Sequence, residues 1–166
     1  MDLKQGIIER IEKDFSKLEE LHSLSFDEIL RVLKRRHEDR KNKSIPVSIF
    51  NNKKLSGLEA VVKFLKEKQG LNYKEIAFLL NRNYDPIAIT YRRAKRELSG
   101  SLDYSSEENI PIEIFCNKKL SVLENITHYL KDSLNLRLSE IASILNRDDR
   151  TIWTVYSRIK KKYETK

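Results

Sequence analysis

The chain has 166 residues, with 33 Lys and Arg against 25 Asp and Glu, so its formal net charge is +8. This basic balance makes a polyanion the first class of partner to consider. The single cysteine, Cys116, excludes an internal disulfide and fits a reducing compartment. No apolar run approaches the roughly 20 residues that span a membrane, and residues 1–8 do not form a signal peptide. We therefore expect a cytoplasmic protein.

The positive charge is unevenly distributed. Residues 1–28 hold four basic and eight acidic side chains, whereas residues 29–43 hold seven basic and two acidic ones. The net charge is +6 over residues 44–98, −3 over residues 99–108 and +4 over residues 109–166. Net positive charge is thus carried by residues 44–98 and 109–166 and is absent from residues 1–28 and from the connector 99–108.

Residues 3–21 place apolar side chains at spacings of three and four, which predicts an amphipathic helix. Its apolar stripe consists of Leu3, Ile7, Ile8, Ile11, Phe15, Leu18 and Leu21. Ser25 followed by Glu28 has the capping-box spacing, so a second helix should begin there and end in the basic run 34–36. Residues 1–43 are therefore predicted to form an amphipathic helical hairpin. It would either dimerise through residues 1–40 or cover the segment that follows.

An internal repeat organises the rest of the chain. A shift of 65 residues superposes residues 44–98 on residues 109–163 without a gap, and 24 of the 55 positions are identical. The repeat predicts two small modules, 44–98 and 109–166. The polar connector 99–108 between them is expected to be a flexible linker.

Each repeat opens with the motif Ile-Pro-x-x-Ile-Phe, at residues 45–50 and 110–115. Because proline disfavours helix for the residue before it, this segment should be extended or turned and should lay its apolar residues on the core. A helix then begins at a capping box in each copy, Ser56 with Glu59 and Ser121 with Glu124. These helices should end at residues that tolerate a left-handed backbone, namely Gly70 and Asn135.

A short helix follows in each copy, capped in the first by Asn72. The small residues Ala77 and Ala142 stand where two helices must cross closely. Asn81 and Asn146 come next, at a turn that requires positive φ and where asparagine is the commonest substitute for glycine.

The last helix of each repeat is predicted to begin at Asp85-Pro86, with Asp85 as the cap, and at Asp148-Asp149 before Arg150. Its buried stripe should contain Ile87, Thr90, Ala94 and Leu98 in the first copy, and Ile152, Val155, Ile159 and Tyr163 in the second. The predicted fold class is therefore all-α, with an amino-terminal helical segment followed by two tandem helix-turn-helix modules.

The joint pattern L-S-x-L-E, L-x-x-x-E-I-A-x-x-L-N-R and I-x-x-x-Y-x-R-x-K resembles the DNA-binding domain of sigma-factor region four. It is also similar to the related four-helix units of response regulators. The resemblance covers each repeat and implies a helix-turn-helix fold that docks on DNA. The chain departs from the sigma pattern because it has two such units, an asparagine at the turn and the Ile-Pro-x-x-Ile-Phe motif. It also resembles uncharacterised archaeal proteins with repeated units of this kind.

In such a fold, the residues opposite the buried stripe of the last helix meet DNA base edges. The base-reading candidates are Arg150, Thr151, Trp153 and Thr154 in the second copy, and Ala88 and Ile89 in the first. An arginine can bridge a guanine edge with two hydrogen bonds, worth roughly 1–3 kcal/mol of discrimination. Trp153 would either pack on a thymine methyl or sugar, or cover the adjacent helix. In the first copy, Asp85 would repel phosphate unless it is occupied as a cap, and Ala88 and Ile89 fit a protein contact nearly as well.

Basic and polar residues that flank these positions are candidates for phosphate binding. They are Arg82, Arg92, Arg93, Lys95, Arg96, Arg147, Ser157, Arg158, Lys160 and Lys161. Other chemistry is not indicated: His22, His37 and His128 lack metal-ligand spacing, and four glycines form no phosphate-binding loop. We expect no cofactor, no metal and no enzymatic activity.

Together these patterns predict a double-stranded DNA-binding protein of the nucleoid, a transcription regulator with two recognition helices in successive major grooves. Tandem modules predict direct-repeat half-sites about one turn apart, and dimerisation through residues 1–40 would add a palindrome. The alternative is a protein-docking module, for example an adaptor on RNA polymerase, with incidental DNA affinity.

Overall fold

A computed structural model describes residues 3–23, 25–41, 43–106 and 108–164, and divides the chain into two compact units, 1–40 and 41–166. The side chains of Leu3 and His37, named in the predictions above, lie outside the described ones. The described residues form eight α-helices and a two-stranded sheet, so the predicted all-α class is confirmed.

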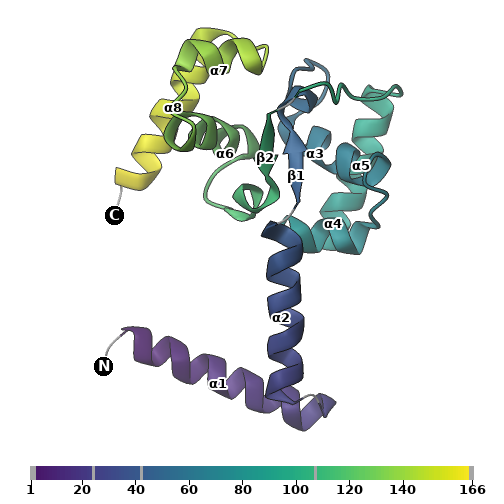
Figure 1. The fold of residues 1–166 in the computed structure, drawn as a ribbon, viewed down its shortest axis with the longest axis vertical. Helices are drawn as coiled ribbons and strands as arrows, with labels where there is room; N and C mark the ends of the chain where they lie inside the picture. Colours follow the sequence, from purple (N-terminus) through teal and green to yellow (C-terminus); the bar gives the residue numbers. More distant parts are fainter. Residues whose placement is uncertain (1–2, 24, 42, 107, 165–166) are drawn as a thin grey trace. The chain divides into compact units, whose positions relative to one another are not determined.

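The first unit contains helix α1 (Leu3–His22) and nearly all of helix α2 (Phe26–Lys41) (Figure 1). The capping box is confirmed, because the Ser25 amide donates to Glu28 Oε2 at 2.9 Å and the Glu28 amide donates to Ser25 Oγ at 3.3 Å. At the junction, the rings of Phe15 and Phe26 meet edge to face with centroids 5.2 Å apart. Most of the apolar stripe of α1 remains exposed, including Ile7, Ile8 and Ile11.

Helix α2 does not end in the basic run 34–36 as predicted, but continues to Lys41. The residues after the run are charged, and they include no glycine or proline to stop a helix. Residues 37–41 have no apolar stripe with which to pack on another element. Their backbone can still form helical hydrogen bonds, so α2 continues through them.

The second unit holds both repeats. The first consists of strand β1 (Ser44–Pro46), a 3-10 turn (Val47–Phe50) and helices α3 (Gly57–Glu67), α4 (Tyr73–Leu79) and α5 (Tyr84–Glu97). The second consists of strand β2 (Asn109–Pro111), a 3-10 turn (Ile112–Cys116), α6 (Val122–His128) with a π-helical turn (Tyr129–Ser133), α7 (Leu138–Ile144) and α8 (Asp149–Glu164). The helices appear in the order that the sequence predicts.

Local signals place most helix ends correctly. The capping boxes of Ser56 with Glu59, Ser121 with Glu124 and Asn72 with Glu75 are all present. Positive φ angles occur at Gly70 (66°), Asn81 (51°), Asn135 (57°) and Asn146 (48°). These residues provide the left-handed positions that end one helix and turn the chain into the next.

The start of α5 differs from the prediction. Its N-cap is Asn83, and Asp85 and Pro86 lie inside the first turn rather than at the cap and first helical position. Pro86 is tolerated there because amides of the first helical turn have no intrahelical acceptor. In the second copy the prediction is confirmed, since Asp148 Oδ1 accepts a hydrogen bond from the Arg150 amide at 2.8 Å.

The Ile-Pro-x-x-Ile-Phe motifs pair with each other. Strands β1 and β2 are antiparallel, and Ile45 lies opposite Ile110, its own equivalent in the repeat. Equivalent residues also meet at Phe50 and Phe115, whose ring centroids are 6.2 Å apart. The repeats are therefore related by a half-turn about an axis near the Ile45–Ile110 pair. In Figure 1, α3, α4 and α5 lie on one side of the strands and α6, α7 and α8 on the other.

The two repeats are not independent modules, because they share one core. A single cluster of buried apolar residues runs from Ile45 of the first copy to Ile152 of the second. Contacts across the interface are reciprocal: Cys116 Sγ donates to the Leu79 carbonyl at 3.1 Å, and Arg147 Nη2 donates to the Asn52 carbonyl at 3.0 Å. Each 3-10 turn thus ends against the turn between the short and last helices of the other repeat.

Residues 99–106 of the connector do not form the flexible linker predicted from its composition. Leu102 is buried, and the ring of Tyr104 lies 5.7 Å from that of Phe64 on α3. Ser48 Oγ donates to the Asp103 carbonyl at 2.9 Å, and the Ser48 amide donates to Ser106 Oγ at 3.1 Å. Ser48 thus satisfies a carbonyl of the connector, and Ser106 satisfies an amide of the first repeat.

Candidate nucleic-acid interface

Helix α8 is held in place by three buried residues, Ile152, Val155 and Ile159, which pack against α6, α7 and Leu120. Tyr163, predicted to be the fourth member of this stripe, is exposed. Its hydroxyl accepts a hydrogen bond from Asn117 Nδ2 at 3.2 Å, and its ring lies 5.5 Å from that of His128. The helix therefore leaves the core before its carboxyl end.

The opposite face of α8 carries the predicted base-reading residues. Arg150, Thr151, Trp153 and Thr154 are all exposed, and the indole of Trp153 is 63% exposed. Thr154 Oγ1 donates to the Arg150 carbonyl at 2.7 Å, which leaves the oxygen's lone pairs available to an outside donor. The suggestion that Trp153 covers an adjacent helix does not fit an indole this exposed.

A shallow hollow of about 550 Å³ lies beside Trp153. Its walls come from the first turn of α7 and the first two turns of α8: Leu138, Ser139, Asp149, Arg150, Trp153 and Thr154. The sequence prediction missed Leu138 and Ser139, although their position at the start of the first helix of the predicted helix-turn-helix unit was a usable signal. The hollow brings an apolar wall, hydroxyl groups and a guanidinium together at the amino end of α8.

The corresponding face of α5 is more apolar. Ile89 is 51% exposed and Ala88 is partly buried. Asp85, at the position equivalent to Arg150, is exposed, and its carboxylate does not cap the helix. Tyr84 and Tyr73 stack edge to face with centroids 6.1 Å apart, at the positions equivalent to Asp149 and Leu138. In the first repeat, this aromatic pair thus occupies the place that the hollow has in the second repeat.

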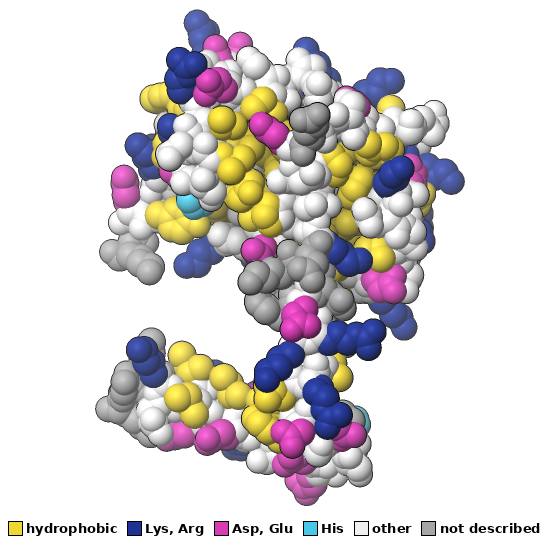
Figure 2. Space-filling model, viewed as in Figure 1, with side chains coloured by type: hydrophobic (Ala, Val, Ile, Leu, Met, Phe, Trp, Pro, Cys, Tyr) yellow, Lys and Arg dark blue, Asp and Glu magenta, His cyan; other side chains and the backbone are white. Residues whose placement is uncertain are grey.

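The structure separates the predicted phosphate-binding residues into two groups. The exposed group lies on α5 and α8 and consists of Arg92, Arg93, Lys95, Arg96, Arg158, Lys160 and Lys161. Some of these have intramolecular partners: Arg93 Nε lies 3.8 Å from Glu59 Oε1, and Lys160 Nζ lies 5.1 Å from the centre of the Tyr156 ring. Ser157 is half-buried. Figure 2 shows Lys and Arg side chains mainly toward the edges of the visible face of the unit 41–166, with hydrophobic groups nearer its middle.

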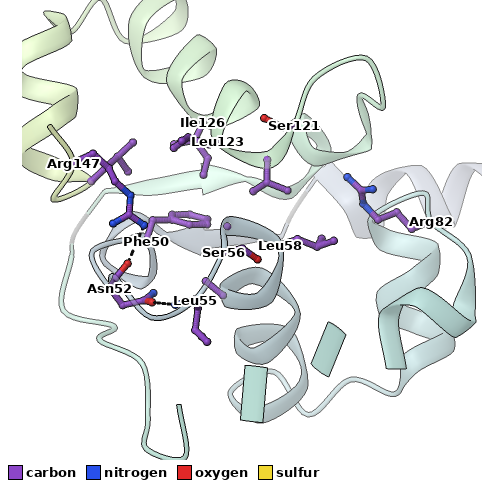
Figure 3. A pocket seen from close by; sticks show the side chains of 14 residues that line it. Phe50, Asn52, Leu55, Ser56, Leu58, Arg82, Ser121, Leu123, Ile126 and Arg147 are labelled. Atoms are coloured by element: carbon purple, nitrogen blue, oxygen red, sulfur yellow. Dashed lines mark hydrogen bonds between the residues drawn. The ribbon is translucent and has the colours of Figure 1, made fainter. Parts of the chain in front are cut away.

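Arg82 and Arg147 form the second group and do not lie with the other phosphate candidates. Both are half-buried and line a hollow of about 500 Å³ between the repeats, together with Phe50, Leu58, Leu123 and Ile126 (Figure 3). Arg147 is held by the Asn52 carbonyl, and Arg82 Nε is buried without a hydrogen-bond partner among the described residues. Both residues lie at the interface between the repeats, a placement that no pattern within one repeat could show, and their phosphate role stays a prediction.

A tyrosine on the last helix of each repeat reaches the carboxyl end of that repeat's first helical segment: Tyr91 reaches α3, and Tyr156 reaches the π-helical turn after α6. The hydroxyl of Tyr91 donates to Glu67 at 3.1 Å, and Glu67 also contacts Nζ of the buried Lys63 at 2.8 Å. The second copy has the same arrangement. Tyr156 donates to Asp132, and His128 Nδ1 lies 2.6 Å from Asp132 Oδ2. Burial, followed by the hydrogen bond to the carboxylate, raises the pKa of Tyr91. Helices α5 and α8 are thus oriented by the same kind of contact.

A further contact orients α8. Lys162 Nζ lies 2.7 Å from Glu124 Oε2, and Glu124 also accepts the Ser121 amide at 2.6 Å. Burial favours a higher pKa for Glu124, but the hydrogen bonds from Lys162 and Ser121 outweigh it and lower the pKa. Glu124 is therefore a carboxylate at neutral pH that joins the amino end of α6 to the carboxyl end of α8.

Within the described ranges, His, Cys, Asp and Glu form no group of three or more that could hold a metal ion. None of the described helices is both long and apolar enough to cross a membrane. No protein-family model, curated protein or solved structure matches the chain.

Proposed function

We propose that the protein binds double-stranded DNA as a transcription regulator, with α8 as the main base-reading helix. The observation that carries this proposal is the exposed amino end of α8, where Arg150, Trp153 and Thr154 surround one hollow. The amino-terminal residues of a recognition helix are those that meet base edges in the major groove. Arg150 would take a guanine edge, and Thr154 and Trp153 would contact a thymine methyl or sugar.

Charge supports DNA as the partner. Arg158, Lys160 and Lys161 follow the reading residues along α8, and Arg92, Arg93, Lys95 and Arg96 cluster on α5. Basic residues on both sides of a base-reading helix meet the two phosphate backbones of a groove. A chain that neutralises several phosphates in this way gains affinity by releasing counterions, so its binding must weaken steeply with salt.

The first repeat contributes a different surface. With Asp85 in place of Arg150 and with Tyr84 and Ile89 exposed, α5 fits phosphate binding through its basic residues better than base reading at its amino end. The exposed apolar residues are the observation that favours the second candidate function, in which α5 docks a protein such as RNA polymerase.

The test is a gel-shift titration with a pool of random duplexes at several salt concentrations, followed by sequencing of the bound fraction. We expect enrichment of a short motif and a linear fall of log affinity with log salt concentration. The double variant Arg150→Ala, Arg158→Ala should lose the enrichment and much of the affinity. Absence of a shift by the parent chain at low salt would overturn the DNA proposal and favour docking to a protein.

A matched control comes from Lys13 and Lys17, two exposed residues of α1. The double variant Lys13→Ala, Lys17→Ala removes two positive charges, as the test variant does, from a helix that the proposal does not use. It should keep the selected motif. Equal losses in both double variants would show that net charge alone, rather than the α8 face, produces the shift.

A further inference from the structure

The arrangement of the repeats adds a property that two tandem modules would not have. Ile45 pairs with Ile110, the position 65 residues later, and Phe50 meets Phe115, again 65 residues later. A Cβ atom built at Gly57 would lie 2.8 Å from Cγ1 of Val122, its equivalent at the start of α6. Residues that meet their own equivalents mark the axis of a half-turn.

The two recognition helices must obey the same relation, because each is fixed to its own repeat by the same contacts. Helix α5 is held to α3 through Tyr91 and Glu67, and α8 is held to α6 and its π-helical turn through Tyr156 and Asp132. The two helices lie on opposite flanks of the unit (Figure 1). A half-turn about the Ile45–Ile110 pair therefore exchanges one reading face with the other.

We propose that the protein reads an imperfect inverted repeat within one DNA duplex, so that a single chain does what a symmetric dimer of helix-turn-helix domains does. The inference rests on the proposed DNA binding and specifies the class of site. An inverted repeat has the same half-turn symmetry as the protein, whereas a direct repeat requires recognition helices related by translation. The direct-repeat expectation assumed such a translation, and the pairing of β1 with β2 excludes it.

The two half-sites should differ in sequence because the exposed faces of α5 and α8 differ. Arg150, Trp153 and Thr154 of α8 correspond to Asp85, Ala88 and Ile89 of α5. The half-site under α8 should contain the guanine that Arg150 contacts, and the half-site under α5 should lack it. The basic residues of α5 would hold its half-site by phosphate contacts, and Ala88 and Ile89 would contact thymine methyls there, so this half-site also contributes sequence preference.

The decisive experiment uses the full chain and the complete site found by selection from random duplexes. Three probes carry its two half-sites in inverted, direct or everted orientation, each with the spacing varied over one helical turn. A fourth probe carries a single copy of the half-site under α8. We expect one inverted probe to bind about tenfold or more tightly than any other, because two linked contacts raise affinity beyond either alone.

Tightest binding to a direct or everted probe would overturn the inference and leave the proposed function standing. The same holds if a footprint covers only one half-site, or if the chain bridges two separate duplexes. Failure to bind any duplex would instead overturn the proposed function. The two failures are therefore distinguishable in one set of titrations.

A variant tests whether the half-turn itself sets the preference. Gly57→Val forces α3 and α6 apart at their amino ends, because Val122 already fills the space that a side chain there would need. We expect the single-copy probe to be bound as before and the preference for the inverted probe to fall to about that of the single copy. Gly100→Ala is the control, since no atom lies within 4 Å of an added Cβ there. Circular dichroism checks that both variants are folded, and retained preference in a folded Gly57→Val would show that the interface does not set it.

Discussion

The hydroxyl of Tyr156 on α8 donates a hydrogen bond to Asp132 at 2.9 Å, 24 residues earlier in the chain. Tyr91 and Glu67 form the same contact in the first repeat at 3.1 Å, also over 24 residues. The two contacts survive although the basic partner of the carboxylate differs, Lys63 in one copy and His128 in the other. The same tyrosine–carboxylate contact thus orients the last helix of both repeats.

We predict that Tyr156→Phe lowers the free energy of unfolding by about 1 kcal/mol, because it removes one hydrogen bond to a charged group at a partly exposed site. Urea denaturation followed by circular dichroism measures this change. Tyr84→Phe is the matched control, since no described residue accepts or donates a hydrogen bond at its hydroxyl, and it should change stability little. Equal effects of the two variants would contradict a specific role for the Asp132 contact.

The ion pair of Glu124 and Lys162 predicts a dependence of stability on pH. Because the folded state lowers the pKa of Glu124 below its ordinary value of 4.5, its contribution is fully present above that value and is lost as the pH falls through the lowered pKa. Glu124→Gln should destabilise the protein by about 1 kcal/mol at pH 7 and by less at pH 3. Thermal unfolding across this range measures the difference.

The control for this titration is Glu59→Gln, at the equivalent position of the first repeat. Both substitutions keep a side chain that can accept the capping hydrogen bond, from Ser56 or from Ser121. Arg93 lies 3.8 Å from Glu59, against 2.7 Å between Lys162 and Glu124. Glu59→Gln should therefore change stability less at pH 7, and a larger loss would show that the cap rather than the ion pair dominates.

Single variants on α8 should separate sequence preference from general affinity. Arg150→Ala should cost roughly 1–3 kcal/mol on the selected site and relax the preference at one base pair. Arg158→Ala should weaken binding to every sequence alike and reduce the slope of log affinity against log salt concentration by about 1. Gel-shift titrations on the selected site and on a scrambled duplex give both quantities. If Arg150→Ala weakened both probes equally, it would be a phosphate contact.

Trp153 provides an optical readout, because it is the one tryptophan in the sequence and its indole is largely exposed. We expect iodide to quench its fluorescence strongly in the free protein and less after the selected duplex is added, because bound DNA excludes the quencher. The variant Arg150→Ala, Arg158→Ala should show no such protection at the same DNA concentration. Unchanged quenching in the parent complex would place the DNA away from the amino end of α8.

The sequence by itself determined the helices, their ends and the exposed face of α8. These features depend on residues within about four positions of each other: Ser121 with Glu124, Asn146 at its turn, or Ile152, Val155 and Ile159 on one stripe. Hydrogen bonds and side-chain spacing of this range are fixed by the helix geometry, so they can be recognised without the fold. Asp85 was wrongly predicted as a cap because two adjacent residues each favour a helix start. The end of α2 was predicted too early because the apolar stripe stops before the backbone hydrogen bonds do.

Only the tertiary structure decided how the repeats are related. The apolar motifs at residues 45–50 and 110–115 could pack in a core whether the second repeat is related to the first by a translation or by a half-turn. The antiparallel pairing of Ile45 with Ile110 shows that the relation is a half-turn. In this half-turn arrangement, Arg147 donates to the Asn52 carbonyl and Leu102 of the connector is buried. Contacts between positions 50 or more residues apart depend on the shape of both surfaces, which residue types and spacings within one repeat do not encode.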